Sequence, residues 1–282
     1  MARVKRSYPT EFKTSGIFCS TLLVLALLLV VSGVFSREGT RNFQLEFSPA
    51  QTAVPIEERF DETPAQVEFT LPYGRWYAIQ LGAYSNEESA LKTAQAYISR
   101  GAAGFVWNDD KYRVMAAAYP NETDARAVRE QLREKHSLES YSYLIEFPSI
   151  TLRLSGAQGQ LDIVKAAFEH LFALTNDLYQ ISCALDRQEI TASEVSKKLN
   201  TVQTQLDIVA IRLKQRFEPP YPDAVKSILD TFEAFSVFTE ALPENEPLVT
   251  LATKLKHQHF AVLWNIKMVY HSLEYTEEGV LK

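Results

Sequence analysis

The feature that most constrains the fold of this chain is an internal duplication. The sequence Ala-Tyr-Ser-Asn-Glu at 83–87 returns as Ala-Tyr-Pro-Asn-Glu at 118–122, thirty-five residues later. The agreement extends backwards from both segments, because Tyr77 then aligns with Tyr112. A period of this length indicates one supersecondary unit that is used twice.

Each copy predicts a strand, a helix and a second strand. An alternating apolar run comes first, at 76–81 and again at 112–116, which is typical of a half-buried strand. The first helix is expected to begin at a capping box formed by Ser85 and Glu88. The polar turn at 108–110 joins the two copies as a hairpin. The order β-α-β-β-α-β predicts an α+β, ferredoxin-like sheet domain with both helices on one face.

Two segments of the duplication resemble a known family. The run Trp-Tyr-Ala-Ile-Gln-Leu-Gly-Ala-Tyr-Ser-Asn at 76–86 resembles the opening of a SPOR domain, the sporulation-related repeat of bacterial envelope proteins. Tyr-Arg-Val at 112–114 resembles the third strand of that family. The resemblance covers about a quarter of the chain and implies a SPOR domain at 73–148. The resemblance therefore implies an extracytoplasmic module that binds peptidoglycan glycan strands, often those stripped of peptide stems at division septa.

Strand alternation predicts which side chains lie on the sheet face away from the helices. Amide and guanidinium groups there would bond sugar hydroxyls, aromatic rings would stack on sugar C–H faces, and the resemblance places a glutamine of the family at position 80. The alternative is that the aromatic side chains only pack and the glutamine is solvated. The candidate glycan-binding residues on this expected open face are Trp76, Gln80, Tyr84, Arg113, Met115 and Trp107.

Three alanines depart from the family pattern. The family usually has a small hydroxyl residue after the glycine, where this chain has Ala83. It usually ends the third strand in a Gly-Pro pair, where this chain has Ala117 and Ala118. These departures support an alternative hypothesis, in which the chain is a membrane-anchored protein–protein scaffold whose SPOR-like domain has lost glycan affinity.

Several function classes are disfavoured by composition. A glycosidase needs two carboxylates across a cleft, but the acids Glu87, Glu88, Glu122 and Asp124 fall in the first turns of predicted helices, where the helix dipole favours them. We therefore expect no enzyme activity. The five histidines are scattered, so neither a metal nor a cofactor is expected. The formal net charge of −6 argues against a nucleic-acid partner.

The N-terminal region predicts a membrane anchor. Residues 1–15 are basic, and the apolar run within 16–36 is long enough to cross a bilayer as a helix. Basic flanks stay in the cytoplasm, so the N-terminus is expected to be cytoplasmic and the later domains extracytoplasmic. The alternative is a cleaved signal peptide with a cleavage site at 34–36. Residues 37–72, rich in Pro and Glu, predict a tether, within which 67–71 alternates well enough to form a short strand.

The C-terminal part, 156–280, has helical periodicity and predicts an antiparallel four-helix bundle. Its clearest stripe is a coiled-coil-like seam that follows a capping box of Thr191 and Glu194. Trp264 is either a core residue or a partner contact. The residues of the seam are Val195, Leu199, Val202, Leu206, Val209 and Leu213.

Together these patterns predict a non-catalytic peptidoglycan-binding protein of the cell envelope. It would be held in the cell membrane by one transmembrane helix and act in cell division or sporulation. The bundle would recruit a protein partner that the sequence does not identify.

Overall fold

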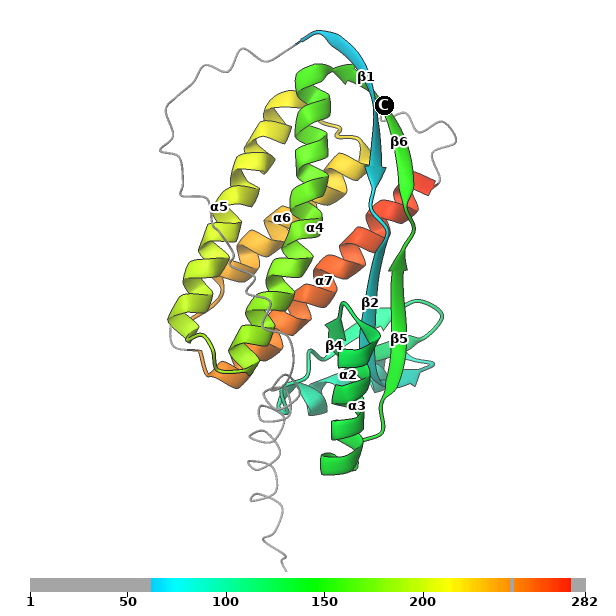
Figure 1. The fold of residues 1–282 in the computed structure, drawn as a ribbon, viewed down its shortest axis with the longest axis vertical. Helices are drawn as coiled ribbons and strands as arrows, with labels where there is room; N and C mark the ends of the chain where they lie inside the picture. The colour runs from blue at the N-terminus through cyan, green and yellow to red at the C-terminus, as the bar shows by residue number, and fades with distance from the viewer. Residues whose placement is uncertain (1–61, 244–245, 275–282) are drawn as a thin grey trace, which may run out of the picture.

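A computed structural model of the chain describes residues 62–243 and 246–274 (Figure 1). The strands are β1 (Pro64–Leu71), β2 (Gly74–Tyr84), β3 (Phe105–Asn108), β4 (Tyr112–Tyr119), β5 (Tyr141–Phe147) and β6 (Ile150–Ala157). The helices are α2 (Glu87–Ile98), α3 (Glu122–His136), α4 (Gln158–Asp186), α5 (Ala192–Arg216), α6 (Asp223–Glu240) and α7 (Leu248–Glu274).

The duplicated segment forms the predicted βαββαβ unit. The first copy supplies β2, α2 and β3, and the second supplies β4, α3 and β5. These strands pair antiparallel in the order β3-β4-β2-β5, so the first strands of the two copies lie together in the middle of the sheet. The predicted α+β fold class, a sheet domain of this type followed by four packed helices, is therefore confirmed.

Asparagine side chains cap both helices of the repeat. Asn121 accepts a hydrogen bond from the backbone N–H of Asp124 at 2.8 Å. In the first copy the cap is Asn86, whose side chain accepts from the backbone N–H of Ser89 at 2.9 Å. The predicted capping box at Ser85 and Glu88 is therefore wrong by one residue, because asparagine caps as well as serine does.

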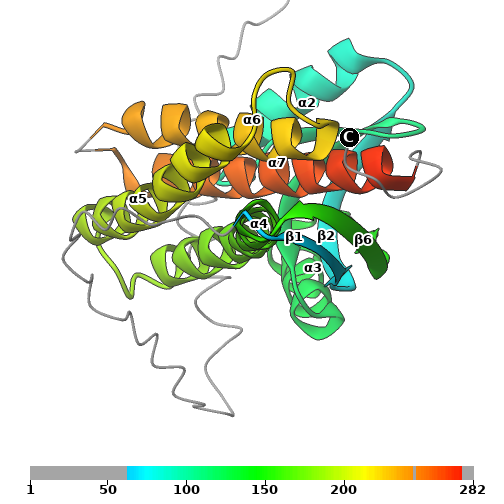
Figure 2. The same cartoon turned by 90° about the horizontal axis from the view of Figure 1, so that it is seen from above.

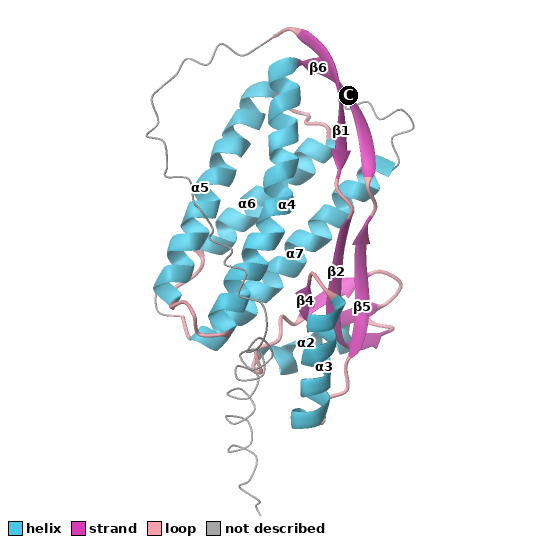
Figure 3. Ribbon diagram, viewed as in Figure 1, coloured by secondary structure: helices cyan, strands magenta, loops and turns pink. Residues whose placement is uncertain are grey.

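A two-stranded ribbon extends the repeat sheet along the bundle (Figure 3). β1 pairs antiparallel with β6 from Pro64 opposite Ala157 to Leu71 opposite Ile150, and the ribbon packs on α4. The strand expected at 67–71 is thus present and begins earlier, so this end of the predicted tether belongs to the folded unit.

The four C-terminal helices form a ring in which each helix packs on its neighbours in sequence and α7 closes on α4 (Figure 2). The seam predicted in α5 is buried at all six positions. Thr191 and Glu194 form the predicted capping box, with the Glu194 carboxylate accepting from the Thr191 N–H at 2.7 Å. Period and capping in the sequence therefore predicted this helix closely.

The bundle packs on the face of the repeat sheet opposite α2 and α3. Trp76 of β2 lies with its ring centroid 4.6 Å from that of His259 on α7 and 5.6 Å from that of Tyr179 on α4. Phe105 of β3 stacks on Phe260 of α7 at 5.8 Å. Sheet and bundle consequently share one hydrophobic core, with the sheet between two helical layers.

In the parts of the chain that the structure describes, no helix is both long and apolar enough to cross a bilayer. The predicted cytoplasmic segment 1–15, the predicted transmembrane helix 16–36 and the tether up to residue 61 lie outside those parts.

Candidate functional site

Three of the six candidate glycan-binding residues lie beneath the bundle. Trp76, Trp107 and Met115 are 9%, 1% and 0% exposed. They lie on the face that strand alternation predicts, away from α2 and α3. The expectation that this face is open is wrong at these positions, because α4 and α7 cover it.

Tyr84 lies on the opposite side of the sheet from the one predicted. Its hydroxyl accepts a hydrogen bond from Thr93 of α2 at 2.9 Å. The cause is an irregularity in the β2–β4 pairing on either side of Gln80, which leaves Leu81 and Ala116 out of the ladder. An extra residue in a strand shifts the alternation beyond it, and Tyr84 therefore turns toward the helices.

Gln80 and Arg113 lie on the same face of the sheet, as predicted, and they contact each other within a polar cluster that also contains Asp109, Asp110 and Tyr143. The Arg113 guanidinium donates to Oε1 of Gln80 at 3.1 Å and to Oδ1 of Asp109 at 3.0 Å, and it also pairs with Asp110. It lies 4.9 Å from the ring centroid of Tyr143, whose hydroxyl donates to Asp109. Gln80 is buried, so the expectation that it lies open on this face is also wrong. It accepts a hydrogen bond from Arg113, whose side chain stays 17% exposed.

The charges in the polar cluster are fixed near neutral pH. Burial alone would raise the pKa of Asp109. Its carboxylate, however, accepts hydrogen bonds from the Tyr143 hydroxyl, from the backbone N–H groups of Asp110 and Lys111, and from the Arg113 guanidinium. These bonds outweigh burial and hold the pKa of Asp109 well below its ordinary value. Burial and the bond to Asp109 raise the pKa of Tyr143 to about 12. The cluster therefore presents a carboxylate, a guanidinium and a neutral hydroxyl in fixed positions, which suits hydrogen bonding to sugar hydroxyls.

An aromatic row runs from this cluster across the sheet to α7 and consists of Tyr143, Trp107 and Trp264. The ring centroid of Trp107 lies 6.3 Å from that of Tyr143 and 4.9 Å from that of Trp264 on α7. The Lys267 ammonium lies 5.3 Å from the centroid of Trp107 and 5.4 Å from that of Trp264. Tyr141, 58% exposed, precedes Tyr143 on the same face of β5. Sequence reasoning missed Tyr143 and Lys267, although the spacing of Trp264 and Lys267 on a predicted helix was visible.

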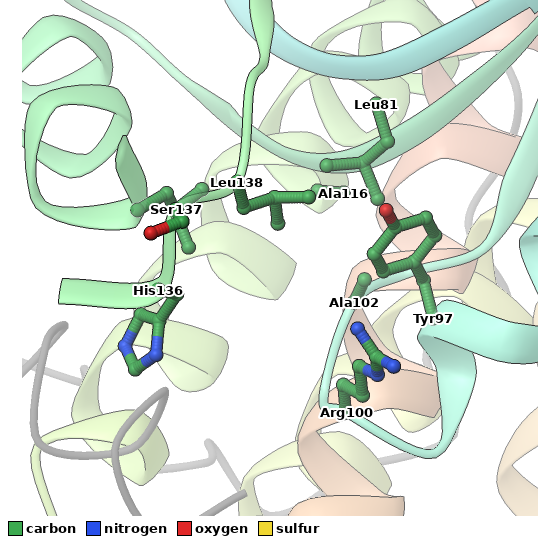
Figure 4. Close-up of a pocket in the computed structure, with 9 residues that line it drawn as sticks. Leu81, Tyr97, Arg100, Ala102, Ala116, His136, Ser137 and Leu138 are labelled. Carbon is green, nitrogen blue, oxygen red and sulfur yellow. The ribbon is translucent and has the colours of Figure 1, made fainter. Parts of the chain in front are cut away.

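The opposite face of the sheet contains a cavity of about 180 Å³ between the ends of α2 and α3 (Figure 4). The two residues left out of the β2–β4 ladder, Leu81 and Ala116, contribute to its walls, and Arg100 and His136 lie at its edge. The full lining is Leu81, Tyr97, Arg100, Ala102, Ala116, Leu132, His136, Ser137 and Leu138. The wall of this cavity is mostly apolar, and the cavity has room for one large apolar side chain.

The four acids considered for catalysis each have a structural role in capping or stabilising a helix. Glu122 pairs with Arg126 across one turn of α3, Asp124 accepts from the Asn121 side chain, and Glu87 and Glu88 occupy the first turn of α2. No group of three or more His, Cys, Asp or Glu side chains in 62–243 or 246–274 could hold a metal ion.

A βαββαβ sheet with a fixed polar cluster and a row of aromatic rings defines a small binding module. Residues 74–142 match the family model of the SPOR domain. No curated protein and no solved structure matches the chain significantly. A SPOR domain is a non-catalytic binding domain of the bacterial cell envelope that implies peptidoglycan binding, typically in cell division. The match begins and ends inside the duplicated segment, and the bundle lies outside it.

Proposed function

We propose that the protein is a non-catalytic binder of peptidoglycan glycan strands, anchored in the cell membrane by residues 16–36, that acts in division or sporulation. Its extracytoplasmic part would consist of the tether, the SPOR domain over 73–148 and the bundle over 156–280. The bundle would recruit a protein partner. The observation that carries the proposal is the SPOR match at 74–142 together with the polar cluster on the sheet face.

The glycan would bind where α7 leaves the sheet face open. In this account Arg113 contacts sugar hydroxyls, Gln80 orients Arg113, and Tyr143 offers a ring for stacking. Trp76, Met115 and Trp107 support these groups from below, since they are buried. Tyr84 lies on the other face and would not contact the ligand.

Cosedimentation of the full chain, purified in detergent, with isolated sacculi tests this site. Arg113→Gln removes the charge and most donors, and we expect binding to weaken about tenfold, as for loss of a charge-assisted hydrogen bond. Arg126→Gln is the matched control, since Arg126 forms an exposed ion pair on α3. Equal binding by the wild type and Arg113→Gln, with unchanged thermal unfolding, would remove this face from the proposal.

A second candidate is the protein–protein scaffold without glycan affinity. The observation that favours it is the coverage of Trp76, Trp107 and Met115 by the bundle. It predicts that the wild-type chain sediments with sacculi no more than an unrelated detergent-solubilised protein does. Binding well above that background, sensitive to Arg113→Gln, would exclude it.

A further inference from the structure

The flank of α7 that borders the polar cluster carries an unusual lysine. Lys267 is half-buried, and its ammonium lies near the faces of two tryptophans, Trp107 and Trp264. Within the described parts of the chain, no carboxylate lies within ion-pair distance of it. A cation held by cation–π contacts and without a counter-ion can pair with an incoming anion.

At the opposite end of the aromatic row, next to Tyr143, the cation is Arg113. Arg113 is paired with both Asp109 and Asp110, so the positive charge at that end is already compensated. Of the two cations at the ends of the aromatic row, Lys267 is therefore the one without a carboxylate partner among the described residues, and it belongs to the bundle and not to the sheet.

The open part of the sheet at Tyr143 lies close to α7. Tyr143 and Trp264 both pack against the buried Trp107, from the sheet and from the helix respectively. Trp264 and Lys267 are three residues apart on α7, so their side chains lie on one side of that helix. A ligand that stacks on Tyr143 next to Arg113 and extends past Trp107 would therefore reach the ring of Trp264 and the ammonium of Lys267.

We propose that the glycan-binding site is shared between the repeat sheet and α7, and that Lys267 of α7 is the residue that recognises the charge of the ligand. Sugar rings stack on Tyr143 and Trp264, hydroxyls bond Arg113, and a carboxylate of the glycan pairs with Lys267. This inference rests on the proposed glycan-binding function and deepens it. It assigns the recognition of the ligand's charge to a helix outside the SPOR match, which ends at residue 142.

Three defined oligosaccharides test the proposal, with binding to the full chain in detergent measured by calorimetry. The first alternates N-acetylglucosamine and N-acetylmuramic acid with free lactyl carboxylates. The second is the same oligosaccharide with those carboxylates capped as methylamides, and the third is an N-acetylglucosamine oligomer of equal length. We expect the wild type to prefer the first, and this preference to shrink as salt is raised.

Lys267→Gln should weaken binding of the free-carboxylate oligosaccharide about tenfold and leave binding of the capped one unchanged. Lys267→Arg keeps the charge and should stay within about twofold of the wild type. Lys226→Gln changes net charge equally on α6, where Lys226 forms an exposed pair with Asp230, and should have no effect. Trp264→Leu should weaken binding of the free and capped forms alike.

Two results would overturn the shared site while leaving the glycan function intact. One is equal affinity of Lys267→Gln and wild type for the free-carboxylate oligosaccharide. The other is an equal loss on the free and capped forms, which would make Lys267 a packing residue. Absence of wild-type binding to all three probes and to sacculi would instead overturn the proposed function itself.

Discussion

Lys256 of α7 and Asp186 at the end of α4 form a buried ion pair, with the ammonium 2.8 Å from the carboxylate. The side chains are 11% and 5% exposed. The same ammonium donates to the carbonyl of Gly101 at 3.2 Å, in the loop between α2 and β3. Next to it, His257 bonds the carbonyl of Ala103 at 3.1 Å. Lys256 therefore joins α7 to α4 and both helices to the loop before β3 in the repeat domain.

Replacing Lys256 by Met should destabilise the chain by about 3 kcal/mol, because it leaves the Asp186 carboxylate buried without its cation. Urea unfolding at pH 7 measures the change. Lys226→Met, which breaks the exposed pair with Asp230, should change stability by less than about 0.5 kcal/mol. A loss as small as that for Lys256→Met would mean that the junction does not depend on this pair.

His259 makes the junction of sheet and bundle sensitive to acid. Its ring packs against Trp76 and Tyr179, and burial lowers its pKa to about 3. In the unfolded chain a histidine binds a proton below a pH of about 6.5. Between these two values the unfolded state binds one more proton than the folded state, so stability falls as pH falls from about 6.5 to 3.

His259→Leu should remove that part of the acid sensitivity. Over the interval from pH 6.5 to 5 the wild type should lose about 2 kcal/mol more than the variant, at about 1.4 kcal/mol per pH unit. Urea unfolding at several pH values gives both slopes. Asp109 also contributes to the loss of stability in acid, because its carboxylate binds a proton less readily in the folded state than in the unfolded state. That contribution is the same in the wild type and in His259→Leu. Phe260→Leu is the control, since it perturbs the same core without a titrating group, and its slope should equal that of the wild type.

The βαββαβ order was predictable because each step depends on local chemistry. The duplicated segment fixes the order of strands and helices, and asparagine caps fix where the helices begin. The same holds for α5, whose regular seam and Thr191–Glu194 box are both local signals. A period of this kind tells which side of a helix is buried, but it does not tell which element buries it.

That limit explains the errors at the candidate site. The apolar stripe of α7 packs on the repeat sheet as well as on its bundle neighbours, and no local pattern in 248–274 distinguishes these partners. Trp76 and Trp107 were therefore assigned to the correct face and wrongly expected to be exposed. Tyr84 was misplaced for another reason, since the break in pairing next to Gln80 has no sequence signature such as a glycine at the bulged position 81.

Gly104 is expected to tolerate no side chain. Its φ of +60° is in the left-handed region, and an added Cβ would lie 2.3 Å from Cγ1 of Ile98. Gly104→Ala should cost about 1–3 kcal/mol in urea unfolding, from backbone strain and this clash. At Gly156 the nearest atom to an added Cβ is the flexible end of Gln160 at 3.2 Å, so Gly156→Ala should cost less. Equal costs for the two variants would show that the turn before β3 is not strained by a side chain.

The repeat domain should depend on the bundle for its stability. A fragment of residues 73–148 would leave Trp76, Phe105 and Trp107 without the α4 and α7 side chains that cover them in the chain. We expect this fragment to bind a hydrophobic dye such as ANS and to lose cooperative thermal unfolding, as exposed apolar surface and lost packing require. Added fragment 149–282 should suppress the dye signal, whereas an equal concentration of an unrelated helical protein should not. A fragment that unfolds cooperatively at the melting temperature of the full chain, without dye binding, would show that the sheet face is stable when open and that the bundle is dispensable for the fold.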